Sequence, residues 1–346
     1  MKLSDFDFNL PLELIAQTPA FKRDESRLMI VDRASGKIQT DTFTQLRFYL
    51  KSNTAITLND TKVFPAKMFG KKINGKKPVE ILLVRELKTN LWEALVKGLA
   101  NTKIGIQLTF GEGKVTALLK EKREGRGIFE FSGVNDLKSE LNQIAKTPLP
   151  PYIKRDQEKT FEMLDQDRYQ TVFANCLGAI AAPTAGLHFT PELIKSLQQN
   201  GLEILFLTLH IGPGTFQPVR SNDITEHLME SEFYKISQRT WNRLAKIKET
   251  DKNILAVGTT TTRTLESIDL NSKAKSDISG WTNIFIHPGY RFKNVDQLLT
   301  NFHLPKSTLF MLVSAFGGIE LMKTAYQTAI AKQFRFYSYG DAMLIL

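Results

Sequence analysis

The chain has 346 residues, 42% of them hydrophobic, and a formal net charge of +10. This length allows about two domains, and the charge favours a polyanionic partner. The single cysteine excludes an internal disulfide and a cysteine-based metal cage, and no apolar run reaches the ~18 residues of a membrane helix.

The first 60 residues predict a short α/β segment. We expect an amphipathic stretch over 10–18, a strand over 27–33 and a helix over 42–50. A strand then runs into a polar turn at Asn59 and Asp60. The N-terminus has no signal-peptide core, so we expect a cytoplasmic protein that does not contact membranes.

The next segment differs in charge and in rhythm. From Lys62 to Asp156 the chain has 19 Lys and Arg against 10 Asp and Glu, whereas the remainder has 27 against 26. Short strands recur about every ten residues, and Asn74-Gly75 predicts a tight hairpin turn. This pattern is typical of a small antiparallel barrel or sandwich. The proline-rich stretch 147–156 predicts a stiff connector.

An α/β pattern returns after the connector. Apolar runs predict strands over 178–183 and 202–211, and Thr190, Pro191 and Gly201 predict the ends of a helix between them. Further elements are a helix over 237–252, strands over 253–258 and 282–287, a helix over 319–334 and a strand over 335–346. We therefore predict an α/β domain with a mixed sheet, residues 1–61 and 157–346, interrupted by a basic antiparallel β-barrel domain, residues 62–156.

Polar clusters follow several of the apolar runs. In an open α/β sheet, ligands bind beyond the carboxyl ends of the strands, so these clusters predict one common pocket. Each cluster taken alone is more often an ordinary turn, and a lone histidine at a strand end is usually structural. The candidate residues are Thr184, His188, His210, Gly214, Thr215, Glu232, Thr259, Thr260, Arg263, Asn301, His303, Lys306 and Asp341.

Several familiar chemistries lack their signatures. There is no G-x-G-x-x-G after a strand and no phosphate-binding G-x-x-x-x-G-K-[ST]. The five histidines have no metal-like spacing, so we expect no metal site, and no G-x-S-x-G elbow supports a hydrolase.

Long segments throughout the chain resemble one family. The sequence is similar to the S-adenosylmethionine:tRNA ribosyltransferase-isomerases of queuosine biosynthesis. The segments that carry the resemblance, in chain order, are SRLMIVDR (26–33), LNDTKVFPAK (58–67), AAPTAGLHFT (181–190), LHIGPGTFQPV (209–219), EHLMESE (226–232), GTTTTRTLES (258–267), NFHLPKSTLFMLVSAF (301–316) and FRFYSYGDAMLI (334–345). Ala179, Glu230 and Thr261-Thr262 depart from the residues common in the family.

The resemblance implies a reaction and its partners. Such enzymes transfer the ribosyl unit of S-adenosylmethionine to 7-aminomethyl-7-deazaguanine at the tRNA wobble position and isomerise it. Epoxyqueuosine forms, and adenine and methionine are released. S-adenosylmethionine is thus a substrate, and no cofactor or metal is implied. The implied fold is an α/β domain with an inserted β-barrel.

The chemistry of this reaction suggests roles for the candidates. It needs proton transfer, which we assign to His188 or His210, and an acceptor near the sulfonium or the amine, which we assign to Glu232 or Asp341. Arg263 fits the methionine carboxylate, with Thr259 and Thr260 offering further hydrogen bonds to it or to ribose. Lys306 fits either a tRNA phosphate or an outer salt bridge. The other substrate-binding candidates have no individual role.

Two other hypotheses remain open at the level of sequence. One is a non-catalytic RNA-binding protein, and the other is an enzyme of nucleoside or sugar metabolism that needs no RNA. We also predict that the basic insert binds the tRNA backbone through its hairpin tip, and that the protein is a monomer. The tip lysines are Lys71, Lys72, Lys76 and Lys77.

Overall fold

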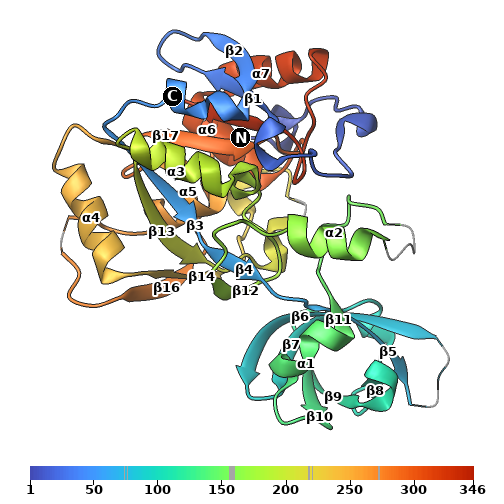
Figure 1. The fold of residues 1–346 in the computed structure, drawn as a ribbon. Coiled ribbons are helices and arrows are strands. Elements are labelled where there is room, and N and C mark those ends of the chain that lie inside the picture. The colour runs from blue at the N-terminus through green and yellow to red at the C-terminus, as the bar shows by residue number, and fades with distance from the viewer. Residues whose placement is uncertain (74, 76, 156–159, 217–218, 220, 272) are drawn as a thin grey trace. The chain divides into compact units, whose positions relative to one another are not determined.

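The computed structural model describes residues 1–346 except 74, 76, 156–159, 217–218, 220 and 272 (Figure 1). The chain divides into two compact units. Met1–Lys62, Pro151–Asp156 and Asp167–Leu346 form the main unit, and Val63–Pro150 with Gln157–Gln166 forms the barrel unit.

The main unit is built on a nine-stranded mixed sheet with the strand order β16-β14-β13-β3-β15-β17-β18-β1-β2. The four central strands β13, β3, β15 and β17 are adjacent and parallel, and β18 runs antiparallel to β17. The strands are β1 (Arg27–Val31), β2 (Ile38–Thr42), β3 (Thr54–Asn59), β13 (Glu203–Leu209), β14 (Glu232–Ile236), β15 (Asn253–Val257), β16 (Ile278–Thr282), β17 (Gln297–Asn301) and β18 (Ala342–Ile345).

The central strands of this sheet are covered on both faces, and their alternate residues contribute to two separate cores. On one face, Met29 and Val31 join a core made with α4 (Gln238–Lys248), α5 (Thr259–Glu266), α6 (Thr308–Gly317) and α7 (Ile319–Ala331). On the other face, Leu28 and Ile30 pack with the 3-10 helix η4 (Phe43–Tyr49) and with α3 (Pro191–Gln199). The predicted α/β class with a mixed sheet is confirmed.

The ends of α3 follow the sequence signals. The Thr190 hydroxyl accepts a hydrogen bond from the Leu193 amide at 3.1 Å, and Pro191 occupies the first turn. Gly201 follows the helix with φ of +81°, a conformation that favours glycine.

The barrel unit is a closed antiparallel barrel. Six strands follow the order β5-β6-β7-β10-β9-β8, and β8 pairs with β5 to close the sheet. A Cβ on Gly70 would lie 2.5 Å from the Phe110 ring, so the barrel interior requires glycine there. The strands are β5 (Lys67–Lys72), β6 (Pro78–Lys88), β7 (Leu91–Val96), β8 (Gln107–Phe110), β9 (Val115–Arg123) and β10 (Arg126–Ser132).

Short elements complete the chain. A two-residue strand β11 (Ala145–Lys146) pairs with β5 and follows helix α1 (Leu137–Ile144). Helix α2 spans Thr160–Arg168, and β4 (Thr61–Val63) forms a two-stranded sheet with β12 (Cys176–Ala179). The barrel predicted from the strand rhythm is confirmed, whereas Asn74 of the predicted turn and Lys76 lie outside the described residues.

Some element predictions are wrong in detail. The strand expected over 282–287 lies instead at Ile278–Thr282, and Ile284 and Ile286 pack on the core from irregular chain. Their burial explains the apolar pattern that suggested a strand. The helix expected over 42–50 is a 3-10 helix, the run at 178–183 contributes only to β12, and β17 was not predicted.

No single helix among the described residues is long and apolar enough to cross a membrane. Helices α6 and α7 taken together have the length and composition of a membrane span, but they are bent by 115° relative to each other.

Candidate active site

The carboxyl ends of the four parallel central strands lie side by side at one edge of the main sheet. Asn59 ends β3, His210 follows β13, Thr259 begins α5 directly after β15 and Gly258, and Asn301 ends β17. Four polar residues from segments that are far apart in sequence are therefore brought to one edge, as the placement rule for open sheets predicts.

Asn59 ties this edge together. Its side-chain oxygen accepts from the Leu209 amide at 3.0 Å, and its amide nitrogen donates to the Leu209 carbonyl at 3.1 Å and to the Thr260 hydroxyl at 3.2 Å. One buried side chain thus fixes the end of β13 relative to the start of α5.

His188 ends the short helix η7 (Thr184–His188) and is held on both ring nitrogens. Its Nδ1 lies 2.7 Å from the Ser26 hydroxyl, and its Nε2 lies 3.3 Å from the Asn301 amide nitrogen. The Asn301 amide nitrogen also donates to the Tyr337 carbonyl at 3.1 Å. An amide nitrogen can only donate, so His188 Nε2 accepts the hydrogen bond from Asn301 and Nδ1 carries the proton.

The electrostatic environment keeps His188 neutral near pH 7. Burial lowers its pKa to about 4, the carboxylate of Asp341 opposes this shift, and the guanidinium of Arg335 adds to it. The ring also packs against Phe43, with centroids 5.0 Å apart. His188 is therefore a fixed, uncharged group in the wall of the site.

His210 is held less completely. Its Nδ1 lies 2.8 Å from the Thr61 hydroxyl, and its ring stacks on Phe233 at a centroid distance of 5.8 Å. Within the described part of the chain, Nε2 has no hydrogen-bond partner. Burial lowers the pKa of His210, and the carboxylate of Asp60 opposes the shift. The imidazole of His210 is half-buried.

Glu232 and Arg263 form a buried ion pair beside His210. Glu232 Oε2 accepts from Arg263 Nη1, and Oε1 accepts from the Gly212 amide at 2.9 Å. Glu232 precedes Phe233, whose carbonyl accepts from the His210 amide at 2.9 Å. Arg263 Nε also donates to the Ile284 carbonyl at 3.3 Å, while Nη2 is buried without a partner among the described residues.

The start of α5 lies between these groups. Gly258 precedes the helix with φ of +90° and provides no side chain to cap it. A Cβ at Gly258 would lie 3.7 Å from the Cβ of Ala185, which places η7 against this helix end. Thr259 and Thr260 are both buried there.

The remaining candidates are placed differently. Thr184 begins η7 and is half-buried, and a Cβ on Gly214 would lie 2.8 Å from the Glu230 side chain, so Glu230 packs over this glycine. The side chain of Thr215 lies outside what the structure describes.

Three candidates have mainly structural contacts. Asp341 is buried and accepts from the amides of Arg27 and Arg335 at 3.0 and 2.8 Å. His303 bonds the Thr300 hydroxyl at 2.8 Å, and burial lowers its pKa to about 3. Lys306 forms an exposed salt bridge with Asp7 at 2.7 Å, the second of its two predicted roles.

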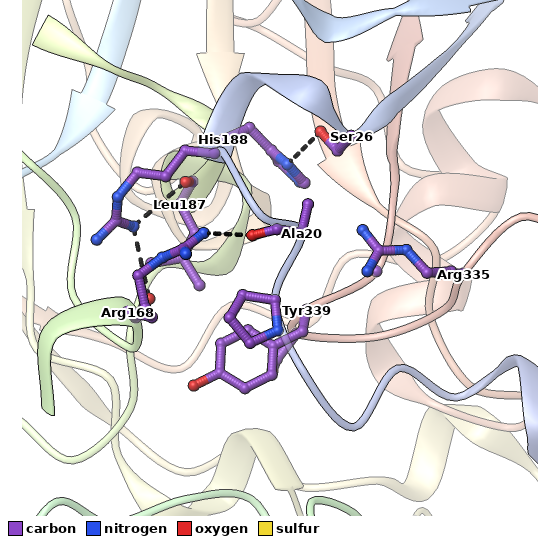
Figure 2. A pocket seen from close by; sticks show the side chains of 11 residues that line it. Ala20, Ser26, Arg168, Leu187, His188, Arg335 and Tyr339 are labelled. Carbon is purple, nitrogen blue, oxygen red and sulfur yellow. Dashed lines mark hydrogen bonds between the residues drawn. The ribbon is translucent and has the colours of Figure 1, made fainter. Parts of the chain in front are cut away.

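A small pocket that opens to solvent adjoins His188 (Figure 2). Figure 2 shows Arg168 and Arg335 on its walls with Tyr339 between them. We call this the arginine pocket. Its lining residues are Pro19, Ala20, Arg23, Ser26, Arg168, Leu187, His188, Arg335, Ser338, Tyr339 and Gly340.

Sequence reasoning missed Ser26, Thr61 and the three pocket arginines as site residues. Ser26 and Thr61 both lie within segments that carry the family resemblance, and that position could have marked them as candidate site residues. Arg23 and Arg168 are 145 residues apart and lie in no common pattern, and only the folded chain brings them together. Among the described residues, no group of three or more His, Cys, Asp or Glu could hold a metal ion.

Comparison with known proteins identifies the family. A family model described as "Queuosine biosynthesis protein" matches residues 3–345. The chain is 46% identical over 347 residues to proteins of Halothermothrix orenii and Staphylococcus haemolyticus, both named S-adenosylmethionine:tRNA ribosyltransferase-isomerase, with complete coverage of each chain. It also resembles the crystal structure of an S-adenosylmethionine tRNA ribosyltransferase from Thermotoga maritima, with 34% identity, 99% and 100% coverage and a TM-score of 0.56. The chain therefore belongs to the queuosine biosynthesis protein family and is an enzyme, a transferase like its curated relatives.

Proposed function

We propose that this enzyme transfers the ribosyl unit of S-adenosylmethionine to 7-aminomethyl-7-deazaguanine at the tRNA wobble position and isomerises it to form epoxyqueuosine. Adenine and methionine are the other products. The observation that carries this proposal is the 46% identity over the full chain to relatives named for this activity. S-adenosylmethionine is a substrate here, and the chemistry calls for no metal ion.

The reaction requires two kinds of proton transfer. The sulfonium acidifies the hydrogens on the adjacent 5′ carbon, so a base must remove one of them. Adenine leaves poorly as an anion, so a ring nitrogen must receive a proton. The attacking amine must be neutral. A positioned acid or base contributes ~10²–10⁴-fold to such steps.

We assign proton transfer to His210 rather than to His188. His188 Nε2 already accepts from Asn301, and burial lowers its pKa to about 4, which makes it a weak base at neutral pH. His210 keeps Nε2 without a partner among the described residues, while Thr61 orients its other nitrogen. His188 and Asn301 then act as a fixed wall of the site.

The Glu232–Arg263 pair suits the methionine end of S-adenosylmethionine. This end carries a carboxylate, an ammonium and the nearby sulfonium. Arg263 Nη2 has spare donors for the carboxylate, and the Glu232 carboxylate lies beside it to favour the cationic groups. Thr259 and Thr260, at the start of α5, offer further hydrogen bonds to the same carboxylate or to ribose.

The barrel unit is suited to the tRNA backbone. Lys71, Lys72 and Lys77 of the β5–β6 hairpin are exposed, and no salt bridge is seen for them among the described residues. Other lysines of this unit are paired, for example Lys120 with Glu130 at 3.1 Å. A wobble base must leave its stack to present the amine, as is usual for enzymes that modify bases. We expect a monomer that acts in the cytoplasm, where its tRNA substrate is found.

The test is release of free adenine. Purified protein is incubated with S-adenosylmethionine and tRNA carrying the precursor base, and adenine and the modified nucleoside are measured by liquid chromatography. Both products should appear together and depend on the tRNA. Binding of tRNA without adenine release would favour a non-catalytic RNA-binding protein, and adenine release without tRNA would favour an enzyme of nucleoside metabolism.

A further inference from the structure

The arginine pocket carries three positive charges. Arg23, Arg168 and Arg335 line it, and no carboxylate is among its described lining residues. Burial lowers the pKa of Arg23, and the positive charge of Arg168 lowers it further. Both effects disfavour the charged form of Arg23, and a cluster of buried guanidinium groups is typical of a site that binds an anion.

Several guanidinium donors remain available in the arginine pocket. Arg23 donates to the carbonyls of Leu187 and Asp167 at 3.3 and 3.0 Å, and Arg168 donates to that of Ala20 at 2.7 Å. Arg168 Nε is buried without a partner among the described residues. Within the described part of the chain, the Arg335 guanidinium has only long contacts, 3.5 Å to Asp341 and 3.4 Å to the Thr18 carbonyl.

The charge of the pocket selects among ligands. A sulfonium would be repelled by three guanidinium groups, and an amino-acid end would leave its ammonium without a carboxylate partner. Asp341, which lies 3.5 Å from Arg335, already accepts from the main chain and from Arg27. An anion without an attached cation, such as a phosphodiester, is the ligand class that this charge favours.

An exposed aromatic side chain belongs to the chain segment that contributes Ala20 and Arg23 to the pocket. Phe21 is 90% exposed, and its carbonyl accepts from Arg168 at 3.1 Å. An aromatic face next to clustered arginines is the combination that binds single-stranded nucleic acid, through base stacking and phosphate contacts.

We propose that the arginine pocket binds a backbone phosphate of the RNA substrate close to the nucleotide that is modified, with Phe21 stacking on a neighbouring base. This inference rests on the proposed function for the identity of the RNA. It adds a phosphate subsite in the main unit, beside His188, to the lysines of the barrel unit.

The experiment uses Arg335→Gln and Phe21→Ala in the full-length protein. Arg335 is loosely held and Phe21 is exposed, so neither change should prevent folding, and Arg335→Lys keeps the charge. Binding of precursor tRNA is measured by fluorescence anisotropy at several KCl concentrations. Arg335→Gln should weaken tRNA binding about tenfold and lower the salt slope by about 0.7, and Phe21→Ala should weaken binding about tenfold with an unchanged slope.

Arg243→Gln is the matched control, because Arg243 pairs with Glu203 at 2.6 Å and is not among the residues that line the pocket. It should leave tRNA binding unchanged. A raised KM for S-adenosylmethionine with unchanged tRNA affinity would assign the pocket to the methionine carboxylate and overturn the proposal, and so would unchanged values for both. Failure of the wild type to release adenine would refute the proposed function alone, since tRNA binding is measured separately.

Discussion

The two histidines at the sheet edge differ in what remains free on their rings. Among the described residues, nothing bonds His210 Nε2, whereas Ser26 and Asn301 occupy both nitrogens of His188. We expect His210→Ala to lower kcat by ~10²–10⁴-fold with little change in the Kd for tRNA. Single-turnover adenine release and anisotropy measure the two quantities.

His188 and His227 provide the comparison. His188→Ala should also reduce turnover more than tRNA affinity, because it removes the buried ring that packs beside the site and bonds Asn301. His227 packs against Phe285 with centroids 5.4 Å apart, so His227→Ala should change kcat little. If His188→Ala lowers kcat strongly and His210→Ala does not, the assignment of proton transfer to His210 is wrong.

Buried His303 makes stability depend on pH. Burial lowers its pKa to about 3, below the 6.5 of an exposed histidine, so the unfolded chain binds more protons at acidic pH. The folded state with neutral His303 therefore has its full stability above about pH 6.5, and this stability is lost as the pH falls towards the folded pKa. The free energy of unfolding of the wild type should fall by up to about 1.4 kcal/mol more per pH unit in this window than that of His303→Gln. Urea titrations at a series of pH values compare the two, and parallel curves would contradict the prediction.

Strand β12 constrains the His210 ring. A Cβ on Gly178 would lie 2.6 Å from Nε2 of His210, so Gly178→Ala must displace the imidazole. We expect this substitution to lower kcat nearly as much as His210→Ala. In a double-mutant cycle, Gly178→Ala should have little further effect on the His210→Ala enzyme. Additive losses would show that Gly178 acts through something other than the ring.

The strands of the sheet were easier to predict than the irregular segments. β1, β3, β13 and β15 follow from their apolar runs, because burial on both faces leaves a continuous hydrophobic signal. β16 was misplaced because it is an edge strand with an alternating, half-exposed pattern, while Ile284 and Ile286 supply core contacts from a loop. Tertiary packing, not local preference, decides such segments.

The site was predictable to a similar extent. The strand-end rule brought attention to His210, Glu232, Arg263 and Asn301 before the family resemblance was considered. The arginine pocket could not be found, since the pairing of Arg23 with the segment around Arg168 depends on how distant loops fold over the sheet.

The uneven charge of the two units should govern tRNA binding by the whole molecule. Replacing Lys71, Lys72 and Lys77 together by Glu should weaken binding and lower the salt slope by about 0.7–0.9 for each phosphate that a lysine no longer neutralises. The free energy of unfolding should change little, because these side chains are exposed. Lys120→Gln, which removes a lysine already paired with Glu130, is the control. An unchanged salt slope after the triple reversal would mean that the barrel unit has another role.

The first segment of the main unit ends one residue after the contact that orients His210. Thr61, whose hydroxyl meets the His210 ring, is the second-last residue of the main unit's first segment, and β4 continues directly into Val63 of the barrel unit. A substitution at Thr61 would therefore act on two features at once, the hydrogen bond to His210 Nδ1 and strand β4, which leads into the barrel unit.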